Sequence, residues 1–484
     1  MDPLSPIWDR ISPKMWRSLL LMGLALTIWA SAFAAVWFRM TVLLVAPLVV
    51  LMGLLLVYNY KPIFFLLIFA IPWSLHTEIG GTLALDLPTE PLMLLFLFIF
   101  LLNTLAGKQF RLTGQIAIFH ILVLLIFFWA AYTTLLSEIP VRSFKWLLAK
   151  GWYLTTFVYM AQRLIQSPED IRKIFWAFFL GMLGVVIFVT IKHAAVGFSF
   201  GEAHLIAYPL YANGVYYSAT LCMFLPWVWF ARTWYNPKSL QWYVILGGMV
   251  LMLLAIATAY KRMGWVMVML MPILYLLIRS KFFERLVYAG SGILALIVAF
   301  LVLNNNFYSF APSFKDVIWH KEDLGGHLEA TFNGTEISGM ERFYRWVAAK
   351  NMVQAMPLTG SGPGTFYPVY QHFTDDAFRT YVSDNPEQST CHNYYLQTFA
   401  EQGFPGGILF LFLNLYMLIR GYRSYHQQQN PHYKSLVMMV MLSLLTIEAF
   451  IFLNELIEVD KIGPMFWLSL TIIHLSDQWH EKKS

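Results

Sequence analysis

Charged residues are scarce in this sequence. They make up 12% of its 484 residues, whereas soluble proteins of this length carry about a quarter. Hydrophobic residues make up 58% and lie in runs of about 20, long enough to cross a bilayer as helices. The short alternating segments of a transmembrane β-sheet are absent. This composition excludes a soluble protein and predicts an all-α, polytopic integral membrane protein.

The sequence also lacks the features of disulfide-rich and nucleic-acid-binding proteins. Its two cysteines, Cys222 and Cys391, cannot form a disulfide framework. Residues 1–17 hold no small-residue cleavage site, so we expect the first apolar run to be retained. The net charge is +6, but most Lys and Arg residues flank apolar runs, so we expect no nucleic-acid partner.

About twelve to fourteen transmembrane helices are expected from the lengths of the apolar runs. The lower number applies if the short third run, or the pairs of runs separated by only a few residues, merge into single helices or re-enter the membrane on the same side. The runs fall at 18–38, 41–58, 62–75, 90–106, 115–136, 144–162, 174–195, 213–231, 241–259, 263–278, 286–303, 405–420, 435–454 and 464–477.

The loops between these runs alternate in charge, which predicts their orientation. Basic loops stay in the cytoplasm. We therefore expect both termini in the cytoplasm and residues 304–394 outside the membrane on the opposite side, which in a bacterium is the periplasm or cell exterior. The basic segments are 107–111, 163–173, 279–285, 420–434 and the C-terminal tail; the neutral or acidic ones are 76–90, 137–142 and 454–463.

Residues 304–394 form one large hydrophilic segment, too long for a structureless loop. They divide the chain into an N-terminal helix bundle at 1–303, a large periplasmic loop domain and C-terminal helices at 395–484. Within the loop, Ser338 and Glu341 have the spacing of a capping box. Apolar residues at helical spacing follow, which predicts a helix over 338–357.

A second helix is expected to start at Ser389 or Thr390, to continue through Glu401 and to end at the GFPGG stretch, residues 403–407. His392 would then lie in its first turn, where the helix dipole favours a neutral imidazole. A neutral histidine can accept a proton from a hydroxyl group. The alternative is an interfacial histidine that only forms hydrogen bonds.

Two pairs of cations are candidates for binding an anion. Lys261 and Arg262 lie in a tight break between apolar runs, on the face where positive charge is normally scarce. Arg342 and Arg345 lie on the predicted loop helix, and guanidinium groups bind phosphate oxygens in bidentate fashion. The alternatives are snorkelling side chains for the first pair and a solvated helix face for the second.

Lys150 lies part-way into an apolar run. Because a buried ammonium group in a membrane is costly, such a residue indicates a functional site. Glu448, also within an apolar run, is a possible partner.

Two further patterns point to no cofactor. The stretch GSGPGTF at 360–366 lacks the Gly-Lys-Ser/Thr ending of a nucleotide-binding loop. Asp375 and Asp376 are adjacent acids without the spacing of metal ligands. We therefore expect neither a nucleotide nor a metal.

Taken together, three segments resemble the O-antigen ligase and polymerase superfamily of bacterial membrane glycosyltransferases. They are the basic break at Lys261 and Arg262, the stretch RFYRWVAAKNMVQAMPLTGSGPGTF at 342–366, and HNYYLQTFAEQGFPGG at 392–407. The resemblance covers roughly residues 200–420. Family members commonly show Ser-Arg or Thr-Arg where this chain has Lys-Arg, so either cation could be the main clamp.

The resemblance implies a glycosyltransferase that acts on a glycan carried by undecaprenyl pyrophosphate, in contact with membrane lipid and without a cofactor. His392 would assist an acceptor hydroxyl, and arginines would stabilise the pyrophosphate leaving group. The implied catalytic residues are His392, Arg262 and Arg342; the implied substrate-binding residues are Lys261, Arg345, Lys150, Asn393, Tyr394 and Glu401.

Three functions remain open. A ligase would move the glycan to a lipid A–core sugar, while a polymerase would use the same donor to extend the glycan itself. A flippase would transport the lipid-linked glycan. Transporters usually show internal repeats and broken helices at the midplane, whereas the polar residues here gather in one outer loop, which favours catalysis.

Overall fold

The computed structural model describes residues 60–79, 83–105, 117–303, 305–311, 337–380, 383–385 and 388–479. The chain divides into two compact units, residues 1–67 and 68–484. Of the first unit, the structure describes the start of helix α4 (Lys61–Ala70). The apolar runs predicted at 18–38 and 41–58 lie outside the described residues. All other elements belong to the second unit.

Eight of the described helices are long and apolar enough to cross a membrane. They coincide with runs predicted from the sequence, which confirms an all-α, polytopic membrane protein. The eight are α6 (Ile118–Leu135), α9 (Pro168–Ala195), α10 (Gly214–Ala231), α11 (Leu240–Thr258), α12 (Arg262–Arg279), α13 (Phe283–Leu303), α17 (Tyr394–Gln427) and α18 (Pro431–Ile451).

Shorter apolar helices correspond to other predicted runs. They include α5 (Thr89–Leu105) and α19 (Gly463–Ser476). The run predicted at 144–162 consists of α7 (Pro140–Leu154), the π-helix η3 (Thr155–Met160) and α8 (Ala161–Leu164). The expected total of twelve to fourteen spans includes runs outside the described residues and stays a prediction.

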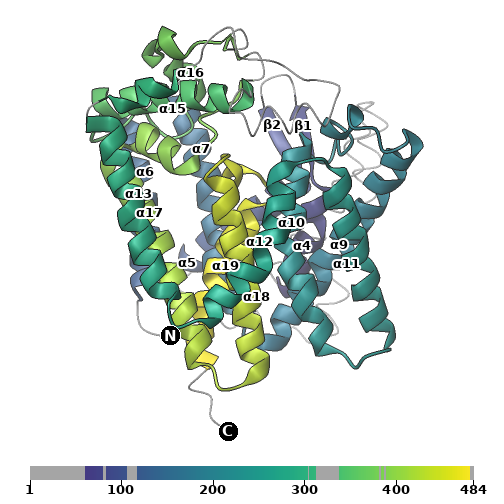
Figure 1. Cartoon of the computed structure of the whole chain (residues 1–484). Helices are drawn as coiled ribbons and strands as arrows, with labels where there is room; N and C mark the ends of the chain where they lie inside the picture. The colour runs from purple at the N-terminus through teal and green to yellow at the C-terminus, as the bar shows by residue number, and fades with distance from the viewer. Residues whose placement is uncertain are drawn as a thin grey trace, which may run out of the picture. The chain divides into compact units, whose positions relative to one another are not determined.

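These helices, most of them labelled in Figure 1, differ in how much of their apolar surface is covered by protein. α10 and α18 pack against each other, and 78% and 72% of their apolar stretches are buried, whereas the apolar stretch of α13 is 0% buried. Since lipid tails are as apolar as leucine, a helix in a bilayer can leave such side chains uncovered. α10 and α18 are therefore central among the described helices, and α13 is peripheral.

A β-hairpin replaces part of the loop predicted at 76–90. Strands β1 (Leu75–Ile79) and β2 (Leu83–Leu87) pair antiparallel, with Leu75 opposite Leu87 and His76 opposite Asp86. The sequence signal is an alternating LALDL stretch after two consecutive glycines, a pattern typical of a hairpin. Because hydrophobic runs lie on either side, this short alternating pattern did not stand out in the sequence.

The large hydrophilic loop contains its own helices and a small core. α15 (Ile337–Ala355) confirms the helix predicted over 338–357, and α16 (Phe366–Tyr370) follows it. Glu341 accepts hydrogen bonds from Thr380 and Ser383, while the side chain of its predicted capping partner Ser338 lies outside the described residues. The buried core comprises Phe307, Tyr344, Val347, Ala348, Ala349, Met352, Val353, Phe366, Val369, Tyr370, Phe378, Cys391 and Ala400.

The helix expected to begin at Ser389 or Thr390 starts later. The backbone of Ser389 is held by the Asn385 side chain, whose Oδ1 accepts from Ser389 N at 2.9 Å. Asn393 is the N-cap instead, since its Oδ1 accepts from Leu396 N at 2.9 Å. α17 therefore begins at Tyr394, and the expectation that His392 lies in its first turn is wrong: the histidine precedes the helix.

The break predicted at GFPGG is confirmed. Gly403 has φ 67° and ψ −174°, a conformation that favours glycine. The backbone groups freed by the break find new partners, as buried backbone polar groups require. Trp129 Nε1 donates to Gln402 O at 2.9 Å, and Phe404 N donates to Pro357 O at 2.8 Å. α17 is thus two helical pieces joined at Gly403.

Candidate active site

His392 occupies a strained position just before α17. Its φ is 53°, in the left-handed region that residues other than glycine seldom adopt. Such strain persists where the surroundings impose it, and it is concentrated at functional sites. Cys391 on one side is fully buried, and Asn393 on the other caps the helix. The imidazole is therefore held between two fixed residues.

The imidazole faces Glu455, an acid that is not among the predicted site residues. His392 Nδ1 lies 3.5 Å from Glu455 Oε2, and the two side chains are 25% and 15% exposed. Among the described residues, these two buried atoms have no closer hydrogen-bond partner. Burial alone would raise the pKa of Glu455, but His392 and Thr390 offset it and lower the pKa below its usual value.

The arginines of α15 lie beside the histidine segment. Trp346 Nε1 donates to Cys391 O at 3.1 Å, which fixes the middle of α15 next to His392. Arg345 is buried, with Nη2 3.5 Å from Glu341 Oε2, and its charge acts on Cys391. Arg342 is half-buried one helical turn before Trp346, on the same side of the helix.

Lys261 and Arg262 begin α12, as the N-cap and first helical residue. Both are half-buried, and burial, followed by repulsion from Arg262, lowers the pKa of Lys261. The Lys261 side chain lies against Gly214, where an added Cβ would be 2.8 Å from its Cε. Two residues further on, Tyr216 is close enough to Glu455 to interact electrostatically. The basic break therefore lies near the acid that faces His392.

Lys150 is 3% exposed and paired within the protein. Its Nζ lies 2.8 Å from Glu458 Oε1 and 3.4 Å from the Tyr394 hydroxyl; the same hydroxyl donates to Glu458. The suggestion that Glu448 pairs with Lys150 is wrong, because Glu448 accepts instead from the hydroxyl of Tyr395.

Three acids thus bind three residues of the HNYY sequence. Glu455 faces His392, Glu458 accepts from Tyr394, and Glu448 accepts from Tyr395. In the sequence, the acidic loop 454–463 indicated only the orientation of the chain in the membrane. Nothing local in the sequence indicates these pairs, since more than 50 residues separate the partners.

Glu401 joins α17 to the GSGPGTF stretch. It is 3% exposed, and its two carboxylate oxygens accept from Gly364 N and Phe366 N, each at 2.9 Å. Gly360 has φ 64°, and an added Cβ would lie 2.3 Å from the Glu401 carbonyl carbon. We call residues 360–366 with Glu401 the clasp.

The clasp also contacts the start of α7. Ser143 Oγ donates to Pro363 O at 2.8 Å and lies 2.7 Å from Ser137 Oγ. Replacing Ser143 with Ala is expected to lower the free energy of unfolding by about 1–2 kcal/mol, because a buried carbonyl loses its donor. Thermal unfolding in detergent measures the change, and Val141→Ala, at an 83% exposed position of the same helix, is the control. Equal midpoints for Ser143→Ala and wild type would contradict the assignment.

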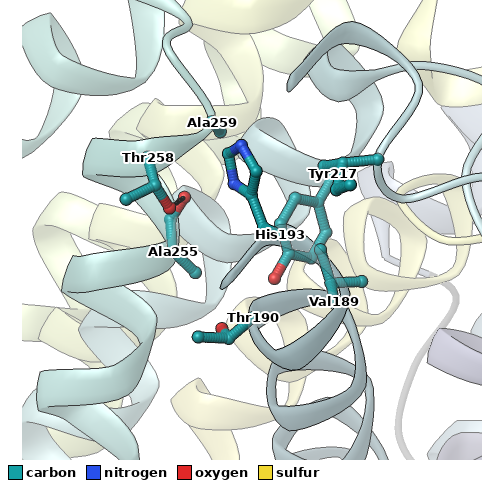
Figure 2. A pocket seen from close by; sticks show the side chains of 8 residues that line it. Val189, Thr190, His193, Tyr217, Ala255, Thr258 and Ala259 are labelled. Carbon is teal, nitrogen blue, oxygen red and sulfur yellow. Dashed lines mark hydrogen bonds between the residues drawn. The ribbon is translucent and has the colours of Figure 1, made fainter. Parts of the chain in front are cut away.

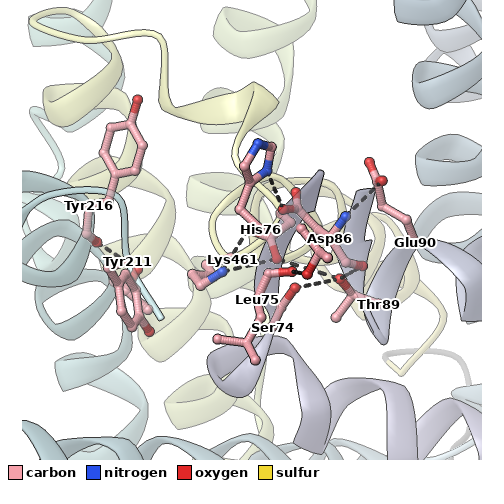
Figure 3. A network of polar contacts seen from close by, with 12 residues as sticks. Ser74, Leu75, His76, Asp86, Thr89, Glu90, Tyr211, Tyr216 and Lys461 are labelled. Carbon is pink, nitrogen blue, oxygen red and sulfur yellow. Dashed lines mark hydrogen bonds and ion pairs between the residues drawn. The ribbon is translucent and has the colours of Figure 1, made fainter. Parts of the chain in front are cut away.

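A second polar network fixes the far end of the acidic loop (Figure 3). Lys461 Nζ lies 2.9 Å from Asp460 Oδ1, and Thr89 Oγ1 donates to Asp460 Oδ2 at 3.5 Å. In the adjoining hairpin, His76 Nδ1 is 3.0 Å from Asp86 Oδ1. Burial, then the nearby Asp460, raises the pKa of Asp86. This network anchors residues 454–463 to β2 and α5.

A small pocket is lined in part by the side chain of His193 (Figure 2). His193 Nε2 lies 3.1 Å from Ser199 O. The pocket has a volume of about 10 Å³, enough for roughly one water molecule. Among the residues that the structure describes, no three His, Cys, Asp or Glu side chains group closely enough to hold a metal ion. The pocket is lined by Val189, Thr190, His193, Ile206, Tyr217, Ala255, Thr258 and Ala259.

Comparison with known families agrees with the predicted resemblance. Residues 247–411 match the family model described as O-antigen ligase. The matched range includes Lys261, Arg262, Arg342, Arg345 and the HNYY sequence, and it ends before the three acids. None of the curated proteins compared matches the chain. The matched region is about a third of this integral membrane protein, and it supports the predicted resemblance to the O-antigen ligase and polymerase superfamily.

Proposed function

We propose that the chain is a membrane glycosyltransferase that moves a preassembled glycan from undecaprenyl pyrophosphate to a sugar hydroxyl of lipid A–core. The observation that carries this proposal is the hydrogen bond from Trp346 to Cys391 O. It joins the helix that bears Arg342 and Arg345 to the segment that bears His392. A base and fixed positive charges therefore lie together outside the apolar stretches, as a sugar pyrophosphate requires.

In the proposed reaction, His392 accepts the proton of the acceptor hydroxyl as its oxygen attacks the anomeric carbon of the donor. The bond between that carbon and the pyrophosphate oxygen breaks, and the pyrophosphate gains negative charge. Arg262 and Arg342 stabilise this charge, which is greater in the transition state than in the bound substrate. Lys261 and Arg345 add to the positive field.

The contacts of four other candidate residues support a role in holding the site together. Lys150 and Tyr394 bind Glu458, Asn393 caps α17, and Glu401 binds backbone amides of the clasp. Since their polar groups are engaged by protein atoms and buried, we propose that they position the substrate-binding groups.

The proposed location is the bacterial inner membrane, with the site in the periplasm and both termini in the cytoplasm. The alternation of basic and acidic loops supports this orientation. The acidic loop, the hairpin and the hydrophilic loop, which hold or anchor the candidate site, belong to the non-cytoplasmic set.

Reconstitution of the purified chain in proteoliposomes tests the proposed function. With a polyprenyl-pyrophosphate-linked glycan and lipid A–core, we expect glycosylated lipid A–core and free polyprenyl pyrophosphate, detected by gel shift and mass spectrometry. Lengthening of the glycan without lipid A–core would identify a polymerase instead. Movement of the donor between leaflets without transfer to either acceptor would overturn the enzyme in favour of a transporter.

A further inference from the structure

We propose that Glu455 is the positioning residue of His392, and that the carboxylate directs the imidazole so that Nε2 meets the acceptor hydroxyl. This inference rests on the proposed function. The carboxylate does not touch substrate. It acts through the histidine, by fixing its orientation and by stabilising the positive charge that the imidazole gains when it takes the proton.

The geometry supports this role at Nδ1. The 3.5 Å separation from Glu455 Oε2 is at the outer limit of a hydrogen bond, and contacts of catalytic groups are often long before substrate binds. Both atoms are buried and lack another hydrogen-bond partner among the described residues. An imidazole that places Nδ1–H toward a carboxylate presents an unprotonated Nε2, which is the form that a general base needs.

The position of Glu455 is itself fixed. The acidic loop that carries it is anchored through Glu458 to Lys150, and through Asp460 to Thr89. At its other end the loop continues directly from α18, a central helix among those described. A loop held on both sides can keep a carboxylate in place against a strained histidine.

The described surroundings of the Glu455 carboxylate include other polar groups besides the imidazole. Besides His392, the groups that interact with its carboxylate include Thr390, Tyr216 and Cys391. A hydroxyl, a phenol and a thiol can donate hydrogen bonds but carry no positive charge when protonated. Of these four groups, the imidazole is the one that gains a positive charge on protonation, and the carboxylate stabilises that charge.

Glu455 also lies outside the matched region of 247–411. The proposed dyad therefore combines a histidine from the family domain with an acid supplied by the C-terminal helices. A chain cut after the matched region would keep the base and the arginines but lose the group that orients the base.

The test compares Glu455→Gln with wild type in the proteoliposome transfer assay. We expect kcat to fall by about 10–100-fold, the range for loss of a group that orients a catalytic ligand, while KM changes less than about 2-fold. We also expect the acid side of the kcat/KM profile to move to lower pH, because a carboxylate that favours the protonated imidazole is lost. Glu284→Gln is the matched control, since Glu284 pairs with Arg423 in the first turn of α13.

Each outcome bears on a different proposal. An active wild type with an equally active, folded Glu455→Gln variant would overturn the role of Glu455 alone, as would a loss that appears in KM with an unchanged pH profile. An inactive wild type with every acceptor would instead overturn the proposed function. If the Gln variant does not fold, Glu455→Asp keeps the charge on a shorter side chain, and a kcat below wild type with the wild-type pH profile is then expected.

Discussion

Replacing His392 with Ala is expected to lower kcat for glycan transfer by about 10²–10⁴-fold, the usual contribution of a general base. The acceptor hydroxyl is a poor nucleophile until its proton is removed, and no second base adjoins it in the proposed mechanism. The arginines remain, so donor binding is expected to persist. Residual activity would come from their stabilisation of the leaving group.

The measurement uses wild type and variant in the same proteoliposomes, with donor binding followed separately. His372→Ala is the matched control, because His372 lies exposed in the same hydrophilic loop. Its activity should equal that of wild type. A folded His392→Ala variant that transfers glycan at the wild-type rate would remove His392 as the base and favour the histidine that only forms hydrogen bonds.

Replacing Glu401 with Ala is expected to lower the free energy of unfolding by about 3 kcal/mol or more, since each buried donor left without an acceptor costs about 1–3 kcal/mol. Gly364 N and Phe366 N would lose their acceptors, and so would the side-chain amide of Gln397, which donates to Glu401 Oε1 at 3.2 Å. Residues 360–366 would lose their contacts with this side chain but keep the backbone hydrogen bonds from Ser361 N to Ala400 O and from Gly362 N to Glu401 O. Loss of transfer activity should accompany loss of stability.

Thermal unfolding in detergent measures this effect. Glu401→Gln keeps one carbonyl acceptor and is expected to be intermediate in stability. Glu138→Ala removes an exposed acid next to the clasp and should change the free energy of unfolding by less than about 0.5 kcal/mol. A Glu401→Ala variant as stable as wild type but inactive would show instead that the carboxylate acts on substrate.

Patterns between residues close in the sequence predicted the helices and the helix break that depend on nearby residues alone. Run length indicated the spans, apolar spacing indicated α15, and the GFPGG stretch indicated the break at Gly403. The start of α17 was misplaced because Ser389, Thr390 and Asn393 can all cap a helix, and the choice depends on tertiary contacts. Asn385 holds Ser389 through its backbone, which leaves the cap to Asn393.

The partners of the candidate site residues could not be predicted in this way. His392 and Glu455, or Lys150 and Glu458, meet only after helices far apart in the sequence have packed. In the sequence, an acidic loop between two apolar runs has the same pattern whether its acids only set the orientation in the membrane or also contact site residues. The β-hairpin was missed for another reason: its strands adjoin apolar helices, so its alternation was obscured.

Because of the break at Gly403, the position of the site residues does not depend on how the membrane-spanning piece of α17 tilts. A continuous helix that spans a membrane tilts as a rigid rod when its apolar length and the hydrocarbon layer do not match. In α17, the piece after the glycine can adjust its tilt, while the piece before it, Tyr394–Gln402, is attached to the clasp and to α15. A change of lipid composition could then move the membrane half of α17 and leave the residues around His392 in register.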